Sequence, residues 1–136
     1  MAGSQEEQAL NFQFIVAVAA GGAIGSVARY VVGIGSGKLF GVAFPWGTLI
    51  INVTGSLLIG VFVALFASRW DLSQAMRIFL TVGICGGYTT FSTFSLDAYY
   101  LIERGQTWAS FAYMIGSVVL SVSALIVALR IVRVAS

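Results

Sequence analysis

The sequence predicts an all-α integral membrane protein with four transmembrane helices. Hydrophobic residues make up 59% of the 136 residues and charged residues only 9%, and the mean hydropathy is +0.97. Such a chain lacks the charged surface of a soluble domain. Uncharged runs long enough to span a bilayer, about 18–20 residues each, occur in four places. They predict helices near residues 11–34, 45–67, 75–100 and 107–131.

Residues 1–10 are expected to form a tail, and residues 11–134 a single four-helix transmembrane domain. The tail carries Glu6 and Glu7, whereas a cleavable signal peptide begins with basic residues. The first span is therefore expected to be retained. The single cysteine, Cys85, excludes an internal disulfide, and the absence of histidine removes the commonest metal ligand. A soluble metalloenzyme or nucleic-acid binder is excluded, and Cys85 is expected to be a packing residue.

Basic residues do not choose an orientation for the predicted spans. Four of them fall on one side of the membrane and three on the other: Arg69, Arg77, Arg130 and Arg133 against Arg29, Lys38 and Arg104. The positive-inside rule requires a clear excess on one side. Two explanations stay open, a chance result of few charges and a dual topology in which copies pair antiparallel.

The segment Gly83–Ser95 lies inside the third predicted span and is unlike the others. It contains three glycines and then five hydroxyl side chains, Thr89, Thr90, Ser92, Thr93 and Ser95. Lipid cannot satisfy loosened backbone groups or a row of hydroxyls, so the segment must face protein or a water-filled path. Such interrupted helices are typical of sites that hold small ions and solutes. The pattern indicates transport of something small.

The first span combines closely spaced glycines with a basic residue. Gly21 and Gly25 form a small-xxx-small pair, which predicts close helix packing. Arg29 follows one turn later. Its side chain either snorkels to the lipid headgroups or draws anions into a polar vestibule.

A polar stripe on the second span has Asn52 at its centre. Thr48, Asn52 and Ser56 recur at i, i+4 and i+8. A buried amide is costly unless it is hydrogen-bonded. Asn52 therefore either ties two helices together or donates its NH₂ group to a passing anion.

Two further patterns suit an ion path. Phe91 and Phe94 are spaced i, i+3, and the positive edge of a phenyl ring can receive a dehydrated anion weakly, which lets the ion leave again. On the fourth span, Tyr113, Ser117 and Ser121 form a second polar stripe. Packing of the rings and hydroxyl contacts between helices are the alternatives.

Acidic residues are expected only near the ends of the spans. Beyond the tail they are Asp71, Asp97 and Glu103. A proton-coupled antiporter needs an acid within the membrane as a relay. This disfavours a small dual-topology multidrug exporter, the main alternative. The polar stripes disfavour a purely structural membrane subunit.

Three motifs, in this order, resemble those of the bacterial CrcB/Fluc fluoride channels. They are Gly-Gly-Ala-Ile-Gly-Ser-Val-Ala-Arg-Tyr (Gly21–Tyr30), Trp-Gly-Thr-Leu-Ile-Ile-Asn-Val-Thr-Gly (Trp46–Gly55) and Gly-Gly-Tyr-Thr-Thr-Phe-Ser-Thr-Phe-Ser (Gly86–Ser95). The likeness extends from about Gly21 to Ser121, and the third motif is highly specific.

The resemblance implies a passive, fluoride-selective channel and not an enzyme. It would let cytoplasmic fluoride leak out across the bacterial inner membrane and so reduce its toxicity. The family has a broken third helix and forms an antiparallel dual-topology homodimer with two pores. A structural Na⁺ at the dimer centre would be held by the backbone carbonyls of Gly86 and Thr89 from both subunits.

The resemblance also implies roles for individual residues. Phe91 and Phe94 match the rings that line the pore, Asn52 a pore-facing amide, and Arg29 a basic vestibule position. Fluoride, a second copy of the chain and membrane lipids are the implied partners, with no nucleic acid. The candidate fluoride-pathway residues are Asn52, Phe91, Phe94, Ser95, Tyr113, Ser117, Ser121, Thr48 and Arg29.

Overall fold

The computed structural model describes residues 11–68 and 71–136, and every regular element in these ranges is a helix. Three helices are long and apolar enough to cross a membrane: α2 (Phe12–Phe40), α3 (Trp46–Ser68) and α7 (Thr107–Ala135). The predicted class of all-α membrane protein is therefore confirmed. The predicted tail at 1–10 and Arg69, one of the counted basic residues, lie outside the described residues.

Capping groups set the ends of α2. The Asn11 side chain accepts a hydrogen bond from the Gln13 amide at 2.9 Å, as expected of an N-cap. At the other end, Gly41 has a φ of 78°, and its amide donates to the Gly37 carbonyl oxygen. The helix runs past the predicted end at residue 34 because Lys38 is favourable in a last turn, and the first residue to break the helix is Gly41.

The segment expected to form the third span consists of two helical stretches. The first is continuous through α4 (Gln74–Ile78), the π-helix η1 (Phe79–Cys85) and α5 (Gly86–Tyr88). The second is α6 (Phe91–Glu103). Thr89 and Thr90 separate the two stretches and have extended backbones. The predicted bounds of 75–100 are close to the outer ends of the pair.

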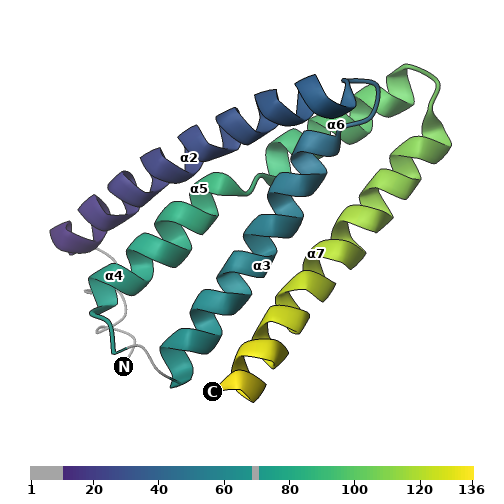
Figure 1. The fold of residues 1–136 in the computed structure, drawn as a ribbon. Helices are drawn as coiled ribbons and strands as arrows, with labels where there is room; N and C mark the ends of the chain where they lie inside the picture. Colours follow the sequence, from purple (N-terminus) through teal and green to yellow (C-terminus); the bar gives the residue numbers. More distant parts are fainter. Residues whose placement is uncertain (1–10, 69–70) are drawn as a thin grey trace.

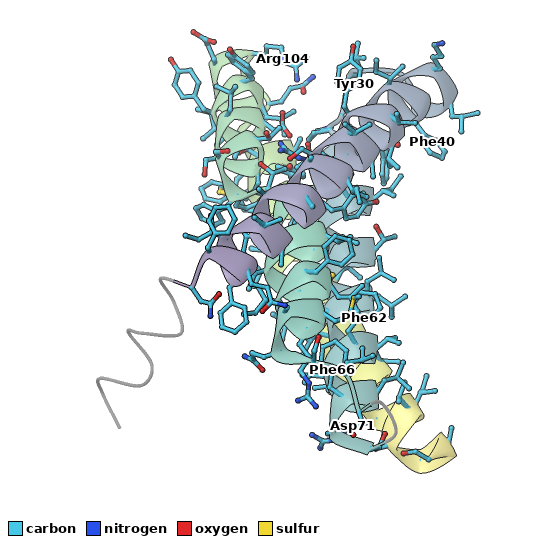
Figure 2. All side chains as sticks on the ribbon, turned by 90° about the vertical axis from the view of Figure 1, so that its left-hand side faces the viewer. Tyr30, Phe40, Phe62, Phe66, Asp71 and Arg104 are labelled. Carbon is cyan, nitrogen blue, oxygen red and sulfur yellow. The ribbon has the colours of Figure 1, made fainter. Side chains whose placement is uncertain are left out.

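The helices pack in two groups. Figure 1 shows α2 lying along the α4–η1–α5 stretch and α3 lying along α7. The shorter α6 continues beyond the interruption and packs on α7. The Phe40 end of α2 diverges from the Arg104 end of α6 (Figure 2).

Glycines let α2 approach the backbone of the third segment. A Cβ atom at Gly21 would lie 2.8 Å from the Cα atom of Gly83, and one at Gly25 would strike the backbone of Ile84 and Gly87. No real Cβ atom tolerates such contacts, so only glycine fits. The expectation that Gly21 and Gly25 serve close helix packing is confirmed.

A small core joins α6 to α7. Tyr113, Leu101 and Ala98 are buried there. The Ser110 hydroxyl donates to the Ala98 carbonyl oxygen at 2.8 Å. Many large apolar side chains elsewhere on the long helices are exposed, as expected of surfaces that face lipid or another membrane chain.

The close approach of α2 predicts a clear difference between neighbouring glycines. Gly21→Ala should lower the free energy of unfolding by about 1–3 kcal/mol, because backbone on both helices must shift. Gly22→Ala is the matched control, since a Cβ atom there meets nothing within 4 Å. Thermal unfolding of the two variants in detergent measures the difference. Equal stability of the two variants would contradict the packing described for α2.

Candidate functional site

The interruption at Thr89 and Thr90 removes main-chain partners on both of its sides. Thr89 has φ −76° and ψ 157°, and Thr90 has φ −151° and ψ 120°. The Thr89 amide still donates to the Cys85 carbonyl oxygen at 3.0 Å. Beyond it the helical i→i+4 pattern stops, so the groups around the interruption need other partners. Thr90 provides one of these partners itself, because its Oγ1 accepts from the Thr93 amide at 3.2 Å and so caps α6.

Side chains from α2 and α3 provide other partners. The Asn52 Nδ2 donates to the Thr90 carbonyl oxygen at 2.9 Å, and the Thr90 amide donates to Asn52 Oδ1 at 2.8 Å. From the other side, Arg29 Nε donates to the Gly87 carbonyl oxygen at 3.1 Å. Asn52 therefore does tie two elements together, while the second hydrogen on its Nδ2 remains for another acceptor.

Three carbonyl oxygens at the interruption stay unpaired. No residue in 11–68 or 71–136 donates a hydrogen bond to the carbonyl oxygen of Gly86, Tyr88 or Thr89. Carbonyl oxygens of unwound backbone are the ligands that membrane proteins use for Na⁺. Two of the three belong to Gly86 and Thr89, so this backbone fits the sodium site that the resemblance implies.

An open pocket of about 400 Å³, here called the break pocket, lies between α3, the interruption and α7. It gathers candidate residues that are far apart in the sequence. Its lining includes Asn52, Phe91, Phe94, Ser117 and Ser121, together with Ser56, Cys85, Gly86, Thr89 and Thr90. The structure therefore brings together five of the nine predicted pathway residues.

Ser117 is the polar group in the break pocket that most needs a ligand. Its side chain is only 5% exposed, and its Oγ has no hydrogen-bond partner among the described residues. An unpaired buried hydroxyl costs about 1–3 kcal/mol. A ligand or water that accepts a hydrogen bond from this hydroxyl would remove that cost.

A second open pocket of about 900 Å³, here called the mouth pocket, lies between α2, the start of α3 and α6. Arg29 and Thr48 line it, and so do Thr93, Asp97 and Arg104. Thr90 lines both pockets. The two pockets therefore meet at Thr90, the residue whose main chain is hydrogen-bonded to the Asn52 side chain.

The two phenylalanine rings differ in their surroundings. Phe91 is 78% exposed, whereas Phe94 is partly buried and packs against the core around Tyr113. The ring centroids of Phe91 and Phe94 are 5.4 Å apart and those of Phe94 and Tyr113 are 5.2 Å apart. Phe94 has a fixed position within this chain, while Phe91 has one face without protein cover.

Two predicted pathway residues lie in neither pocket. Tyr113 is buried at 1% exposure between α6 and α7, and its hydroxyl donates to Asp97 Oδ2 at 3.1 Å. Ser95 is exposed, and its hydroxyl donates back to the Phe91 carbonyl oxygen at 3.0 Å. The stripe of Tyr113, Ser117 and Ser121 therefore starts in a packed core and reaches the break pocket only from Ser117 onward.

Asp97 and Thr54 are polar residues that were not among the predicted pathway residues. Asp97 was expected near the end of a span, and it lies in α6 toward the outer end of the third segment, half-buried beside the mouth pocket. Thr54 and Tyr88 hydroxyls lie 2.9 Å apart and link α3 to α5; no spacing rule in the sequence indicates this pair.

Comparison with known proteins assigns the family. The family model described as CrcB-like protein, Camphor Resistance (CrcB), matches residues 16–129. A protein of Nitrobacter winogradskyi named fluoride-specific ion channel FluC is 73% identical over 125 residues, which cover 92% of this chain and 99% of that protein.

More distant relatives carry the same name. One from Rhodospirillum centenum is 49% identical over 123 residues, covering 90% of this chain and 98% of the relative. One from Rhizobium meliloti is 51% identical over 119 residues, covering 88% and 95%. The match includes all three motifs and both pockets, and the chain described here belongs to the CrcB family.

Proposed function

We propose that this protein is a passive fluoride channel that lets cytoplasmic fluoride leave the cell. The observation that carries the proposal is the break pocket, where the unpaired Ser117 hydroxyl lies with Asn52 and two phenylalanine rings. Fluoride is a small and strongly hydrated anion, so a path for it must replace water with hydrogen-bond donors. Hydroxyls, the free Nδ2 hydrogen of Asn52 and ring edges are such donors. The relatives' names support the same ion.

Weak donors suit a conducted ion better than a fixed positive charge. Neither Lys nor Arg is among the described residues that line the break pocket, so none of these residues would hold the anion tightly. Arg29 and Arg104 line the mouth pocket instead, outside the break pocket. Fluoride would enter by the mouth pocket, pass Thr90 and move along Ser117 and Ser121.

The helical stretches 74–88 and 91–103 together form the fourth crossing of the membrane in this proposal. At about 1.5 Å per residue they reach roughly 40 Å, enough for a hydrocarbon core of about 30 Å. The interruption is tolerable in a bilayer because side chains and the pockets serve its backbone groups. The chain is then a four-helix, multi-pass protein of the bacterial inner membrane.

An antiparallel homodimer would complete the site. Phe91 is 78% exposed, and a ring without cover on one face cannot enclose an ion. A second copy in the opposite orientation would close each break pocket and give two equivalent pores. The nearly balanced basic residues support equal insertion in both directions.

Sodium fits the centre of such a dimer. The carbonyl oxygens of Gly86 and Thr89 from both copies would hold it. A bound Na⁺ would be coordinated by the unpaired oxygens and would join the two interrupted helices. The multidrug exporter alternative is not favoured, because the family and the relatives' names indicate a fluoride channel.

Passive fluoride permeation is tested with purified protein in liposomes. Vesicles loaded with fluoride should release it only when valinomycin and K⁺ carry the compensating charge, and chloride should be retained. Uncoupled ion flow is expected because no energy source is part of the path. Efflux that required a proton gradient, or equal passage of chloride, would refute the channel.

Dual topology is tested by locating one terminus. A tag at the C-terminus should be found on both sides of the membrane in roughly equal amounts, because the basic residues balance. Adding two or three lysines between α6 and α7 should bias the population toward one orientation. A single orientation for the unmodified chain would contradict the antiparallel dimer.

The phenylalanine rings should matter more for conduction than for assembly. Phe91→Ile or Phe94→Ile keeps apolar bulk and removes the ring quadrupole, so fluoride flux should fall by about tenfold, the change produced by a barrier about 1.4 kcal/mol higher. Phe62→Ile, in the stacked Phe62–Phe66 pair on α3, is the control and should conduct normally. Dimers of the Phe91 and Phe94 variants that conduct like the parent would assign both rings to packing alone.

A further inference from the structure

Two side chains reach the interruption from opposite sides and bond to its main chain. Asn52 comes from α3 and holds both the amide and the carbonyl of Thr90, at 2.8 and 2.9 Å. Arg29 comes from α2 and holds the Gly87 carbonyl oxygen at 3.1 Å. An anion pathway alone requires neither contact, because each of these bonds is made to the protein's own backbone.

The Asn52 contact imitates a backbone pair. A carboxamide carries one donor and one acceptor side by side, as a peptide group does. Thr90 is thereby held in an extended conformation, and its Oγ1 remains free to cap α6 at the Thr93 amide. Since α6 begins at Phe91, the directions of Phe91 and Phe94 depend on how Thr90 is held.

The Arg29 contact depends on the shape of the guanidinium group as well as its charge. The donor is Nε, the nitrogen next to the aliphatic stem. Lysine has no nitrogen at this position. The close approach of α2 at Gly25, one turn earlier, brings the stem of Arg29 within reach of Gly87. A Cβ atom at Gly87 would lie 2.7 Å from the Gly22 carbonyl oxygen, so this approach leaves no room for adjustment.

Resting on the channel function proposed above, we propose that Arg29 and Asn52 are positioning residues that substitute for the missing helical hydrogen bonds. They fix the interruption in one conformation. By occupying the carbonyl oxygens of Gly87 and Thr90, they leave those of Gly86, Tyr88 and Thr89 available. They act on the ion path through Gly87 and Thr90, and the charge of Arg29 is secondary to its Nε contact.

Substitutions of Arg29 in the full-length dimer separate the effect of its charge from the effect of its Nε hydrogen bond. Arg29→Lys keeps the charge and loses Nε, and Arg29→Met keeps apolar bulk and loses both. We expect both variants to reduce fluoride flux by about tenfold, with the reduction unchanged between low and high ionic strength. Arg77→Lys is the matched control, because Arg77 Nε also donates to a carbonyl oxygen, that of Leu72 at 3.2 Å, and neither residue is among the described residues that line the two pockets. It should conduct normally.

A role as an anion attractor predicts a different pattern. Arg29→Lys would then conduct like the parent, and the loss in Arg29→Met would shrink at high salt, because salt screens long-range attraction. That result would overturn the proposal for Arg29.

The Asn52 contact is tested by hydrogen exchange, which needs no transport. In the unchanged protein the Thr90 amide should exchange at least tenfold more slowly than the Ser92 amide, for which the described residues supply no partner. Asn52→Leu should abolish this difference. Asn52→Asp should keep part of the Thr90 protection, because it still accepts, and lose flux, because it cannot donate to the Thr90 carbonyl.

The comparison of Thr90 and Ser92 exchange in the unchanged protein tests the positioning role even where a variant fails to assemble. Equal exchange of Thr90 and Ser92 would overturn the positioning role, as would a protected Thr90 amide in the Asn52→Leu dimer. The latter outcome would make Asn52 a pore donor only. A protein that showed these exchange patterns and carried no fluoride would refute the channel function and leave the positioning role standing.

Discussion

The need to satisfy main-chain hydrogen bonds inside a membrane governs this structure. A helix satisfies its own backbone groups, whereas an interrupted helix exposes several of them in a medium without water. The interruption at Thr89 and Thr90 creates this problem, and residues from two other helices satisfy some of the exposed groups. Helix packing near the interruption follows from bringing those two side chains into place.

The glycines of α2 are part of that solution. Gly21 and Gly25 lie against the backbone of η1 and α5, so α2 is close enough for Arg29 to reach Gly87. A larger residue at Gly25 would move α2 outward and lengthen the Arg29 contact. Gly21, Gly25 and Arg29 of the first motif therefore form one structural unit, although in the sequence the glycines indicate packing and the arginine indicates charge.

Hydropathy and motif spacing predicted the helices and most of the break pocket. The three long helices were found because each is apolar over a full span. Asn52, Ser117 and Ser121 were found because polar residues at helical spacing stand out in an apolar chain. The reciprocal bond between Asn52 and Thr90 escaped prediction, because hydropathy does not determine which main-chain groups an interruption leaves unpaired.

The two groups of helices meet at the interruption, and this determines how the rings are held. The stretch 74–88 packs on α2, while α6 packs on α7 through Tyr113, Ser110 and their partners. Asn52, on the α3 that packs along α7, joins the second group to Thr90, and the contact of Thr54 with Tyr88 joins it to the first. Phe94 is therefore fixed by the α6–α7 core, while α2 packs against the backbone of η1 and α5 just before the interruption. The relative position of rings and carbonyls rests on a few hydrogen bonds across the interruption, and a change in any one of them alters both sets of groups together.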